Sequence, residues 1–516
     1  MERKRVAIVG SGIAGLSTLW TLRNTPHEIH LFEKEDRLGG HTNTVTWHHN
    51  GHSTPVDTGF IVMNTATYPN FIAFLQELGI KTIKSEMTFG ISRDKGAFEW
   101  SGTSLSALFA QPTNALKPRF WRMIFDIVRF NQFSLNLLTS RSTIPPSFSI
   151  GEYLEREGYS EAFRDDYLIP MTACVWSTDA DKCALEFPAL TLVRFLWNHH
   201  LLNTVAERPP WLTIEGGSNR YIDAVMKECS RAQVHLGTEI ESLTRKNGKV
   251  QLVLRRSREA AREEEFDEVV LACHGDQARW IVGGAATYEE KGILSAFETT
   301  PNTAYLHSDL SLMPIRRTAW SSWNYLTSSK KSSQAPSKSS GNLQTVSLTY
   351  DMNILQSLSP ATFGDILVTL NPETPPSPAL TQATYQYRHP LYNARMVAAQ
   401  EQLEQIQGKR GVWYAGAWTG YGFHEDGFAS GMRVGLRLGG SVPWEVQDAK
   451  FMRGVTPVFG WKDALVRIVI VVLQLWISLL ERMLGVERRS TTKATGVNGS
   501  MWANGNGKAN GKAKAA

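Results

Sequence analysis

The chain has 516 residues, of which 42% are hydrophobic and 20% are charged, and this length predicts two domains and an appendage rather than a single core. Its net charge of +5 is too small at this length to form a basic stripe, so we expect no nucleic-acid partner. Four cysteines without a Cys-x-x-Cys pair argue against a zinc site, an iron–sulfur cluster and a redox disulfide, and they favour an intracellular protein without a metal.

The chain opens with a predicted strand, a glycine-rich turn, a helix and a second strand. Gly10, Gly12 and Gly15 have the G-x-G-x-x-G spacing of a dinucleotide-binding turn. The first glycine permits the bend, the second lets the backbone approach a pyrophosphate, and the third lets helix and strand pack closely. Glu33, at the end of the second strand, would accept a hydrogen bond from a ribose hydroxyl and would repel a 2′-phosphate, which disfavours NADP. The first strand begins so early that we expect no signal peptide.

A glycine pair, Gly39-Gly40, follows Glu33 and predicts a second close pass of the backbone along a longer dinucleotide. Residues 42–58 then alternate like two strands around Asn50-Gly51, a strong signal for a type I′ hairpin turn. Three histidines lie near this turn, but no acid or cysteine completes a ligand set. We therefore favour solvated turn residues over a metal site.

Two long stretches between the dinucleotide segments are predicted to form a substrate domain. The first contains a helix at 69–79, short strands within 82–100, a helix at 119–139 and an apolar helical region at 149–203. Its bulky side chains form either the core of a cap or the wall of a channel for a lipid-like substrate. The second stretch has predicted strands at 303–308, 318–326, 343–351 and 366–370, with a polar segment at 328–341 that predicts a disordered loop.

Between these stretches the chain is expected to return to the dinucleotide domain at residues 211–217. A helix at 220–228 and strands at 233–235, 250–255 and 268–272 should follow. The run of charges at 255–265 predicts a solvated hairpin tip.

A third motif lies at residues 413–431, WYAGAWTGYGFHEDGFASG. With the first turn and the run EKEDRLGGH at residues 33–41, it resembles the three signatures of the flavin-containing amine oxidase, phytoene desaturase and protoporphyrinogen oxidase superfamily. In that superfamily a strand ends at the Ala-Gly, here Ala415-Gly416, and a helix begins near the position of Asp426-Gly427. Within it, the chain most resembles, over about residues 1–440, predicted NAD/FAD-binding proteins encoded beside cyclopropane fatty acid synthases.

The resemblance implies an α/β fold with a discontinuous Rossmann-type FAD-binding domain at 1–65, 205–275 and 401–445. An α+β substrate domain at 66–204 and 276–400 would be interleaved with it. FAD is the implied cofactor, and His41 is a conceivable covalent attachment point. The residues expected to bind FAD are Gly10, Ser11, Gly12, Ile13, Ala14, Gly15, Glu33, Lys34, Arg37, Gly39, Gly40, His41, Thr58, Gly59, Val234, Gly416, Ala417, Glu425, Asp426, Gly427 and Phe428.

Three functions remain open. The first is an FAD-dependent oxidase or desaturase that takes hydride from an apolar, fatty-acyl or other lipid-like substrate, with molecular oxygen or another acceptor taking the electrons. The second is a flavin amine oxidase, although His424 stands where amine oxidases carry a tyrosine of their aromatic cage. Because histidine titrates near neutral pH, His424 is the candidate catalytic acid or base. The third is a flavin-binding subunit without catalysis.

The segment after Gly440 lies outside the resemblance and ends in a predicted hydrophobic helix. Residues 468–480 are nearly all apolar, with apolar residues on all sides of the predicted helix, and this run is short for a membrane span. A buried docking helix is one interpretation, but the basic, glycine-rich tail favours membrane attachment at 446–487. Residues 488–516 predict a disordered tail, and we expect an intracellular, membrane-associated protein.

Overall fold

The computed structural model describes residues 2–139, 144–145, 147–176, 185–203, 208–256, 259–329 and 343–483. The chain forms two compact units, Met1–Val458 and Phe459–Ala516. The first unit holds the sheets and the candidate site, and the second holds one long helix.

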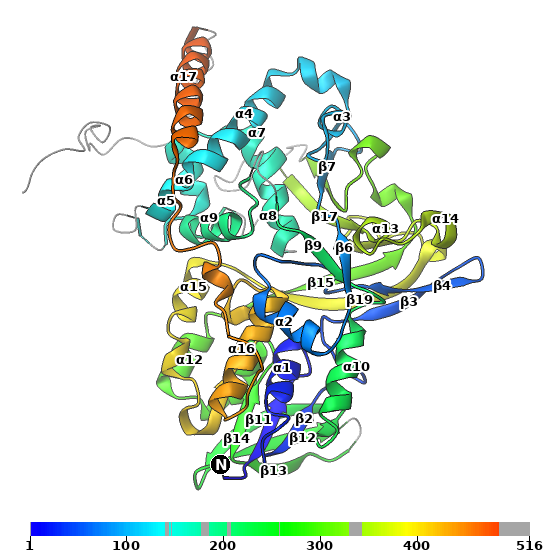
Figure 1. Cartoon of the computed structure of the whole chain (residues 1–516), viewed down its shortest axis with the longest axis vertical. Coiled ribbons are helices and arrows are strands. Elements are labelled where there is room, and N and C mark those ends of the chain that lie inside the picture. The colour runs from blue at the N-terminus through cyan, green and yellow to red at the C-terminus, as the bar shows by residue number, and fades with distance from the viewer. Residues whose placement is uncertain are drawn as a thin grey trace, which may run out of the picture. The chain divides into compact units, whose positions relative to one another are not determined.

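A five-stranded parallel sheet forms the base of the first unit. Its order is β10 (Gln233–His235), β2 (Glu28–Phe32), β1 (Arg5–Val9), β14 (Glu268–Leu271) and β20 (Val412–Tyr414). These strands come from three distant stretches of the chain, and helices α1 (Ile13–Thr21), α10 (Asn219–Glu228) and α16 (His424–Arg437) lie beside them (Figure 1). The Rossmann-type fold class is confirmed.

Helices α1 and α16 pack closely because small residues face each other. A Cβ atom at Gly431 would overlap the carbonyl oxygen of Ala14. The hydroxyl of Ser17 donates to the Phe428 carbonyl at 2.9 Å, and that of Thr18 donates to the Gly431 carbonyl at 3.0 Å. This contact joins the first motif to the third, although more than 400 residues separate them.

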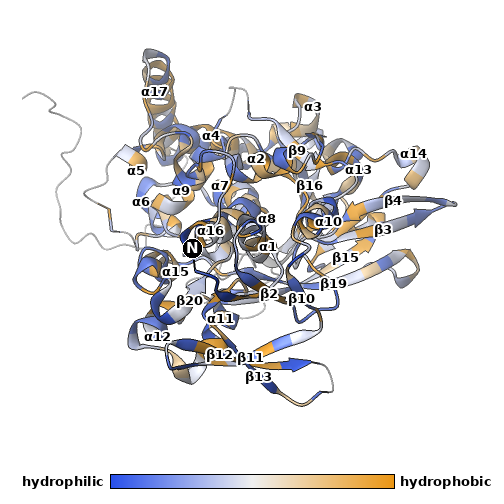
Figure 2. Ribbon diagram, turned by 60° about the horizontal axis from the view of Figure 1, so that its bottom comes forward, coloured by the Kyte–Doolittle hydropathy of each residue, from blue (hydrophilic) through white to orange (hydrophobic). Residues whose placement is uncertain are grey.

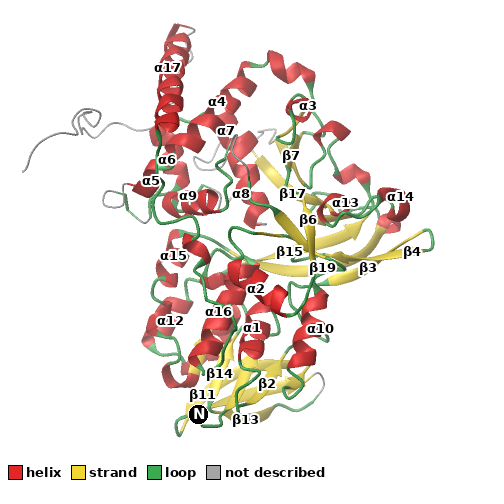
Figure 3. Cartoon of the chain, viewed as in Figure 1, coloured by secondary structure: helices red, strands yellow, loops and turns green. Residues whose placement is uncertain are grey.

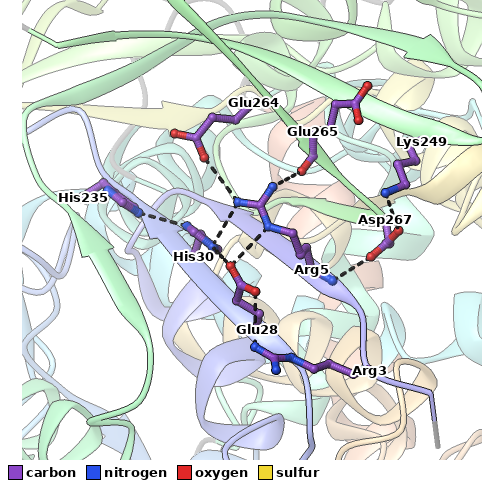
Figure 4. Close-up of polar contacts among 9 residues, drawn as sticks. All are labelled: Arg3, Arg5, Glu28, His30, His235, Lys249, Glu264, Glu265 and Asp267. Atoms are coloured by element: carbon purple, nitrogen blue, oxygen red, sulfur yellow. Dashed lines mark hydrogen bonds and ion pairs between the residues drawn. The ribbon is translucent and has the colours of Figure 1, made fainter.

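A three-stranded antiparallel sheet consists of β11 (Thr238–Lys246), β12 (Lys249–Arg256) and β13 (Arg262–Phe266), with hydrophobic stretches on β11 and β12 (Figure 2). The predicted hairpin tip at 255–265 is therefore partly wrong, because β13 is a charged edge strand. The Glu264 carboxylate of this strand lies 3.5 Å from the Arg5 guanidinium. Arg5 also pairs with the Glu28 carboxylate at 3.2 Å (Figure 4). Such long-range partners cannot be recognised from a charge run alone.

A seven-stranded mixed sheet dominates the remainder of the first unit (Figure 3). Its order is β19 (Thr381–Pro390), β15 (Thr299–His307), β18 (Leu367–Leu370), β17 (Leu343–Asp351), β16 (Trp323–Ser329), β7 (Phe89–Arg93) and β8 (Phe98–Ser101). Strand β19 was not predicted, and the start of β16 was predicted at 318, where the chain forms a short 3₁₀ turn instead. Most of the loop expected at 328–341 lies outside the described residues.

Smaller elements complete the first unit. The expected hairpin is confirmed as β3 (Thr44–His49) and β4 (His52–Asp57), with left-handed backbone at Asn50 and Gly51. A small sheet contains β5 (Met63–Asn64), β9 (Trp211–Ile214) and β6 (Thr82–Ser85). The other α-helices are α2 (Pro69–Glu77), α3 (Leu105–Leu108), α4 (Pro118–Phe133), α5 (Asn136–Thr139), α6 (Ile150–Glu157), α7 (Glu161–Phe163), α8 (Ile169–Trp176), α9 (Ala189–Asn198), α11 (Gly275–Val282), α12 (Tyr288–Leu294), α13 (Met352–Leu355), α14 (Pro360–Phe363) and α15 (Ala394–Gln400).

The second unit contains α17 (Trp461–Met483), a helix of 23 residues that confirms the predicted hydrophobic helix. By length and composition alone this helix could cross a membrane. The expectation of apolar residues on all sides is wrong, however. At 100° per residue, Asp463, Arg467, Gln474, Ser478 and Glu481 fall within about 60° of one another on one face. The rest of the circumference is largely apolar and exposed. The tail expected to be disordered lies outside the described residues.

Candidate functional site

One cavity of about 460 Å³ brings the three motifs together in the first unit. Fourteen of the predicted residues line it: Gly10, Gly12, Ile13, Ala14, Glu33, Lys34, Arg37, Gly39, Gly40, His41, Gly59, Gly416, Ala417 and His424. Eight others do not line it but surround or support it, namely Ser11, Gly15, Thr58, Val234, Glu425, Asp426, Gly427 and Phe428.

The glycine-rich turn leaves room for a ligand at the start of α1. Gly10 has a φ of +101° and its N–H donates to the Phe32 carbonyl at 2.8 Å, which closes the turn. A Cβ atom at Gly15 would overlap the Gly10 carbonyl, so helix and turn can meet only with glycine there. A Cβ atom at Gly12 would meet nothing within 4 Å, and Gly12 caps α1 without a side-chain hydrogen bond. The free N–H groups of this helix end suit an anion such as a pyrophosphate.

Glu33 is held in place by the turn that precedes α1. One carboxylate oxygen accepts hydrogen bonds from the Ser11 N–H at 2.9 Å and the Ser11 hydroxyl at 2.6 Å. The other accepts from the Glu35 N–H at 3.0 Å. Ser11 therefore orients Glu33 rather than lining the cavity. Glu33 itself lines the cavity, as a ribose acceptor must.

The second motif shapes the cavity through its backbone. Arg37 donates to the carbonyl oxygens of Gly40 at 2.9 Å and Thr42 at 3.2 Å, and so holds the glycine loop. A Cβ atom at Gly59 would overlap the His41 carbonyl, which explains the glycine there. Arg37 thus acts at least partly by fixing this loop.

Two predicted residues outside the cavity lie in its supporting structure. The Thr58 hydroxyl bonds with the hydroxyl of Tyr387, a cavity residue, at 2.8 Å. Val234 lies in β10, paired with Leu31 of β2, at the edge of the parallel sheet.

The third motif serves mainly to build the framework. Helix α16 begins at His424, two residues earlier than expected. Glu425 accepts hydrogen bonds from the N–H of Asn70 at 3.2 Å and of Phe71 at 2.8 Å, at the start of α2. Asp426 accepts from the Phe423 N–H at 2.9 Å and caps α16. Glu425 therefore joins α16 to α2, and Asp426 fixes the start of α16, so neither acid lines the cavity.

The remaining residues of this motif are positioned by packing. Gly427 lies against Ile13 of α1, because a Cβ atom there would come within 2.7 Å of the Ile13 side chain. Phe428 is buried among Phe71, Phe74 and Trp444.

His424 lines the cavity as expected, but it is an uncharged group. Its ring stacks on Phe60 with centroids 3.7 Å apart, and its Nε2 lies 3.1 Å from the Tyr221 hydroxyl. Burial lowers the pKa of His424 to about 3, so the imidazole is neutral at pH 7. The expectation that His424 titrates near neutral pH is therefore wrong for this structure.

Three half-buried histidines form a cluster on another part of the cavity lining. The ring of His41 lies 5.6 Å from that of His274 and 5.2 Å from that of His389, measured between centroids. Burial lowers the pKa of His274 and of His389 to about 4, and burial together with the neighbouring histidines lowers that of His41 well below its usual value. The Nε2 atom of His41 is buried without a hydrogen-bond partner.

This cluster was not predicted from the sequence, because its members come from distant segments. His274 lies three residues beyond the end of β14, and this position just after a buried strand is the one local signal that could have nominated it. Within the described ranges, no three His, Cys, Asp or Glu side chains are arranged to hold a metal ion.

Most of the remaining lining is apolar or aromatic, and the charged members among its described residues are Glu35, Glu239 and Arg388. Its bulky members come from α8, the seven-stranded sheet and the segment before α16: Trp176, Trp323, Tyr350, Tyr387, Tyr392, Trp418 and Phe423. Among the described residues of the lining, the carboxylates are Glu33, Glu35 and Glu239. All three belong to one region, because the Thr238 N–H donates to the Glu33 carbonyl at 2.8 Å and the Gly237 N–H to the Glu35 carbonyl at 2.9 Å. The cavity thus has a charged region and an apolar region.

Known proteins match the chain in sequence and in fold. Residues 8–78 match the family described as an NAD(P)-binding Rossmann-like domain. The flavin-dependent L-tryptophan oxidase RebO of Lentzea aerocolonigenes is 24% identical over 263 residues, 46% of this chain and 52% of that protein. A 15-cis-phytoene desaturase of Arabidopsis thaliana is 26% identical over 215 residues, 38% of this chain and 36% of that protein. The chain thus spans about half the length of the first relative and about a third of the second.

Among solved structures, a fatty acid isomerase from P. acnes that produces CLA is similar in fold. Its TM-score is 0.56 at 14% sequence identity, and the match covers 84% of this chain and 99% of that one. At this identity the likeness concerns the fold alone.

Proposed function

We propose that this chain, whose sequence and fold relate it to the superfamily of flavin amine oxidases and phytoene desaturases, is an FAD-dependent oxidoreductase. The observation that carries the proposal is the single cavity that joins the glycine turn, Glu33 and the third motif to an aromatic region. Within the superfamily, its proposed place is with the group encoded beside cyclopropane fatty acid synthases.

The chain's own groups fit a bound FAD. The open space at Gly12 and the uncapped start of α1 would receive the pyrophosphate. Glu33 would accept hydrogen bonds from the ribose, and its negative charge disfavours NADP. When bound, FAD would supply the hydride acceptor.

The proposed substrate is apolar, with a fatty-acyl or similar lipid chain as the favoured class. The aromatic region offers no carboxylate among its described residues to pair with an ammonium group, and its histidines are neutral. The name of one similar protein, a phytoene desaturase, points to an apolar chain as well. One substrate carbon would lose a hydride and its neighbour a proton, leaving a C=C bond, while molecular oxygen or another acceptor takes the two electrons.

An amine oxidase is the second candidate, because RebO is named as an L-tryptophan oxidase. Anaerobic mixing of the purified protein with each class of substrate distinguishes these two candidate functions. We expect an unsaturated fatty acid or its ester to bleach the flavin absorbance of the purified protein, and primary and secondary amines to leave it unchanged. Bleaching by an amine at a comparable rate would favour the amine oxidase. A yellow protein that no candidate substrate reduces would favour a flavin-binding subunit.

The proposed partner of α17 is a lipid bilayer, which would make the protein membrane-associated inside the cell. Its 23 residues extend about 35 Å, against a hydrocarbon core of about 30 Å. Large apolar side chains, among them Ile468, Leu475 and Trp476, are more than half exposed. Flotation of the full chain with phospholipid vesicles tests this proposal, and a protein that stays at the bottom of the gradient contradicts it.

A further inference from the structure

The segment that ends the first unit, residues 446–458, lies against α9 and is named the strap here. It is held by two α9 side chains, Asn198 and Arg194, and by one side chain of its own, Arg453. Asn198 donates through Nδ2 to the Ala449 carbonyl at 2.6 Å, and its Oδ1 accepts from the Arg453 N–H at 3.2 Å. Arg194 donates to the Val455 carbonyl, and Arg453 donates to the Trp197 carbonyl at 2.7 Å. The strap is therefore an ordered part of this unit.

Despite this fixed backbone, the strap exposes apolar side chains. Val446, Phe451, Met452, Val455 and Val458 are between 36% and 93% exposed. Lys450 lies beside Phe451, with its ammonium 5.7 Å from the ring centroid, and is also exposed. Apolar side chains with a neighbouring cation match the requirements of a phospholipid surface, where the former enter the acyl boundary and the latter meets the headgroups.

The same helix borders the aromatic region of the cavity. Phe195 of α9 stacks on Phe423 with centroids 5.0 Å apart and packs on Trp176 at 4.6 Å. Phe423 and Trp176 both line the cavity. The strap and the apolar part of the cavity are therefore separated by the thickness of one helix.

We infer that the strap is a second membrane-contacting element, which seats the α9 side of the first unit on a phospholipid surface. This inference rests on the proposed membrane attachment, and it adds an orientation: the aromatic part of the cavity faces the lipid from which an apolar substrate would come. The continuity of the chain supports it, because the strap ends where the unit that carries α17 begins.

Hydrogen–deuterium exchange on the full chain tests the inference, with phosphatidylcholine vesicles prepared with and without anionic phosphatidylglycerol. Amide exchange in residues 449–458 should slow when vesicles are added, while the exposed tip of the β3–β4 hairpin should exchange as before. Slowing with both lipids assigns the contact to apolar insertion. Slowing only with phosphatidylglycerol means that Lys450 and its neighbours bind headgroups without insertion, and this outcome overturns the acyl-boundary contact.

A triple variant, Met452→Glu, Val455→Glu and Val458→Glu, is the second test of this membrane contact. We expect its vesicle affinity to fall roughly tenfold or more, since three apolar side chains would no longer enter the membrane. The matched control, Leu105→Glu, Leu116→Glu and Tyr288→Glu, alters three exposed apolar residues elsewhere and should bind like the unaltered chain. If the protein floats with vesicles but exchange in the strap does not change, the inference is wrong and the attachment by α17 stands. If the protein does not float, both the membrane attachment by α17 and the membrane contact of the strap are wrong.

Discussion

At the scale of single residues, Gly12 is the position where the fold and the proposed cofactor can be separated. A Cβ atom there meets no protein atom, yet it would occupy the space at the start of α1. We expect Gly12→Val to fold normally and to reduce flavin occupancy about tenfold or more, measured as the flavin-to-protein absorbance ratio. Gly292→Val, at a helical glycine that also has open space around it, is the control. Full flavin occupancy in the Gly12 variant would show that the first motif does not bind the cofactor.

His424 gives a second prediction at this scale. If its neutral imidazole exchanges a proton with the substrate, His424→Ala should keep flavin bound and slow substrate-driven bleaching by about a hundredfold or more. Its pKa of about 3 means that the ring gains a proton only as pH falls through that value, so His424 should add no ionisation to the rate between pH 5 and pH 8. Unchanged kinetics in the variant would reduce His424 to a packing partner of Phe60.

At the scale of elements, Glu425 joins α16 to α2. Its carboxyl group accepts from the Asn70 side chain as well as from two backbone N–H groups at the start of α2. Glu425→Ala would leave these buried donors without a partner and should lower the free energy of unfolding by roughly 1–3 kcal/mol, whereas Glu425→Gln should retain part of the bonding. Chemical denaturation measures the difference, with exposed Glu445→Ala as the control. If Glu425→Ala, Glu425→Gln and the unaltered chain are equally stable, α2 does not depend on this residue.

Elements also show what the sequence could predict. The first strand, turn and helix follow from glycine spacing and apolar runs, because each depends on neighbours within a few residues. β13 and β19 were missed because a polar or charged strand is specified by its partner, β12 in one case and β15 in the other. The same reason applies to the site. The motif glycines were predictable, whereas the His41, His274 and His389 cluster exists only once the parallel sheet and β19 are brought together.

At the scale of the whole molecule, neutral histidines with lowered pKa values link stability to pH. Burial lowers the pKa of His199, His274, His307 and His389 to about 4, below the ordinary value of 6.5. Each therefore contributes to the free energy of unfolding in full above pH 6.5. This contribution decreases as pH falls below 6.5, where the unfolded chain gains the proton first, and it is lost once pH has fallen through about 4. Between pH 6.5 and pH 4, one such histidine changes the free energy of unfolding by up to about 1.4 kcal/mol per pH unit.

His307 tests this link away from the cavity. Its Nε2 lies 2.7 Å from the Thr369 hydroxyl, and its Nδ1 accepts from the Asp309 N–H at 3.0 Å. His307→Gln should be less stable than the unaltered chain at pH 7, and the gap should narrow as pH falls from 6.5 to 4. Denaturant titrations at several pH values measure the gap, with exposed His48→Gln as the control. A gap that does not change with pH would contradict the predicted linkage.

The order of strands in the parallel sheet has a consequence for biosynthesis. The central strands β1 and β14 are paired only after residue 271 has been made, and β20 and α16 come after residue 411. At roughly 5–20 residues per second, a ribosome needs from about 20 to about 80 seconds to travel from β2 to β20. Throughout this interval the face of α1 that α16 later covers, with Ala14, Ser17 and Thr18, has no partner within the sheet domain. A nascent chain of this protein should therefore depend on chaperones until α16 has been made, and it should acquire its cofactor only afterwards.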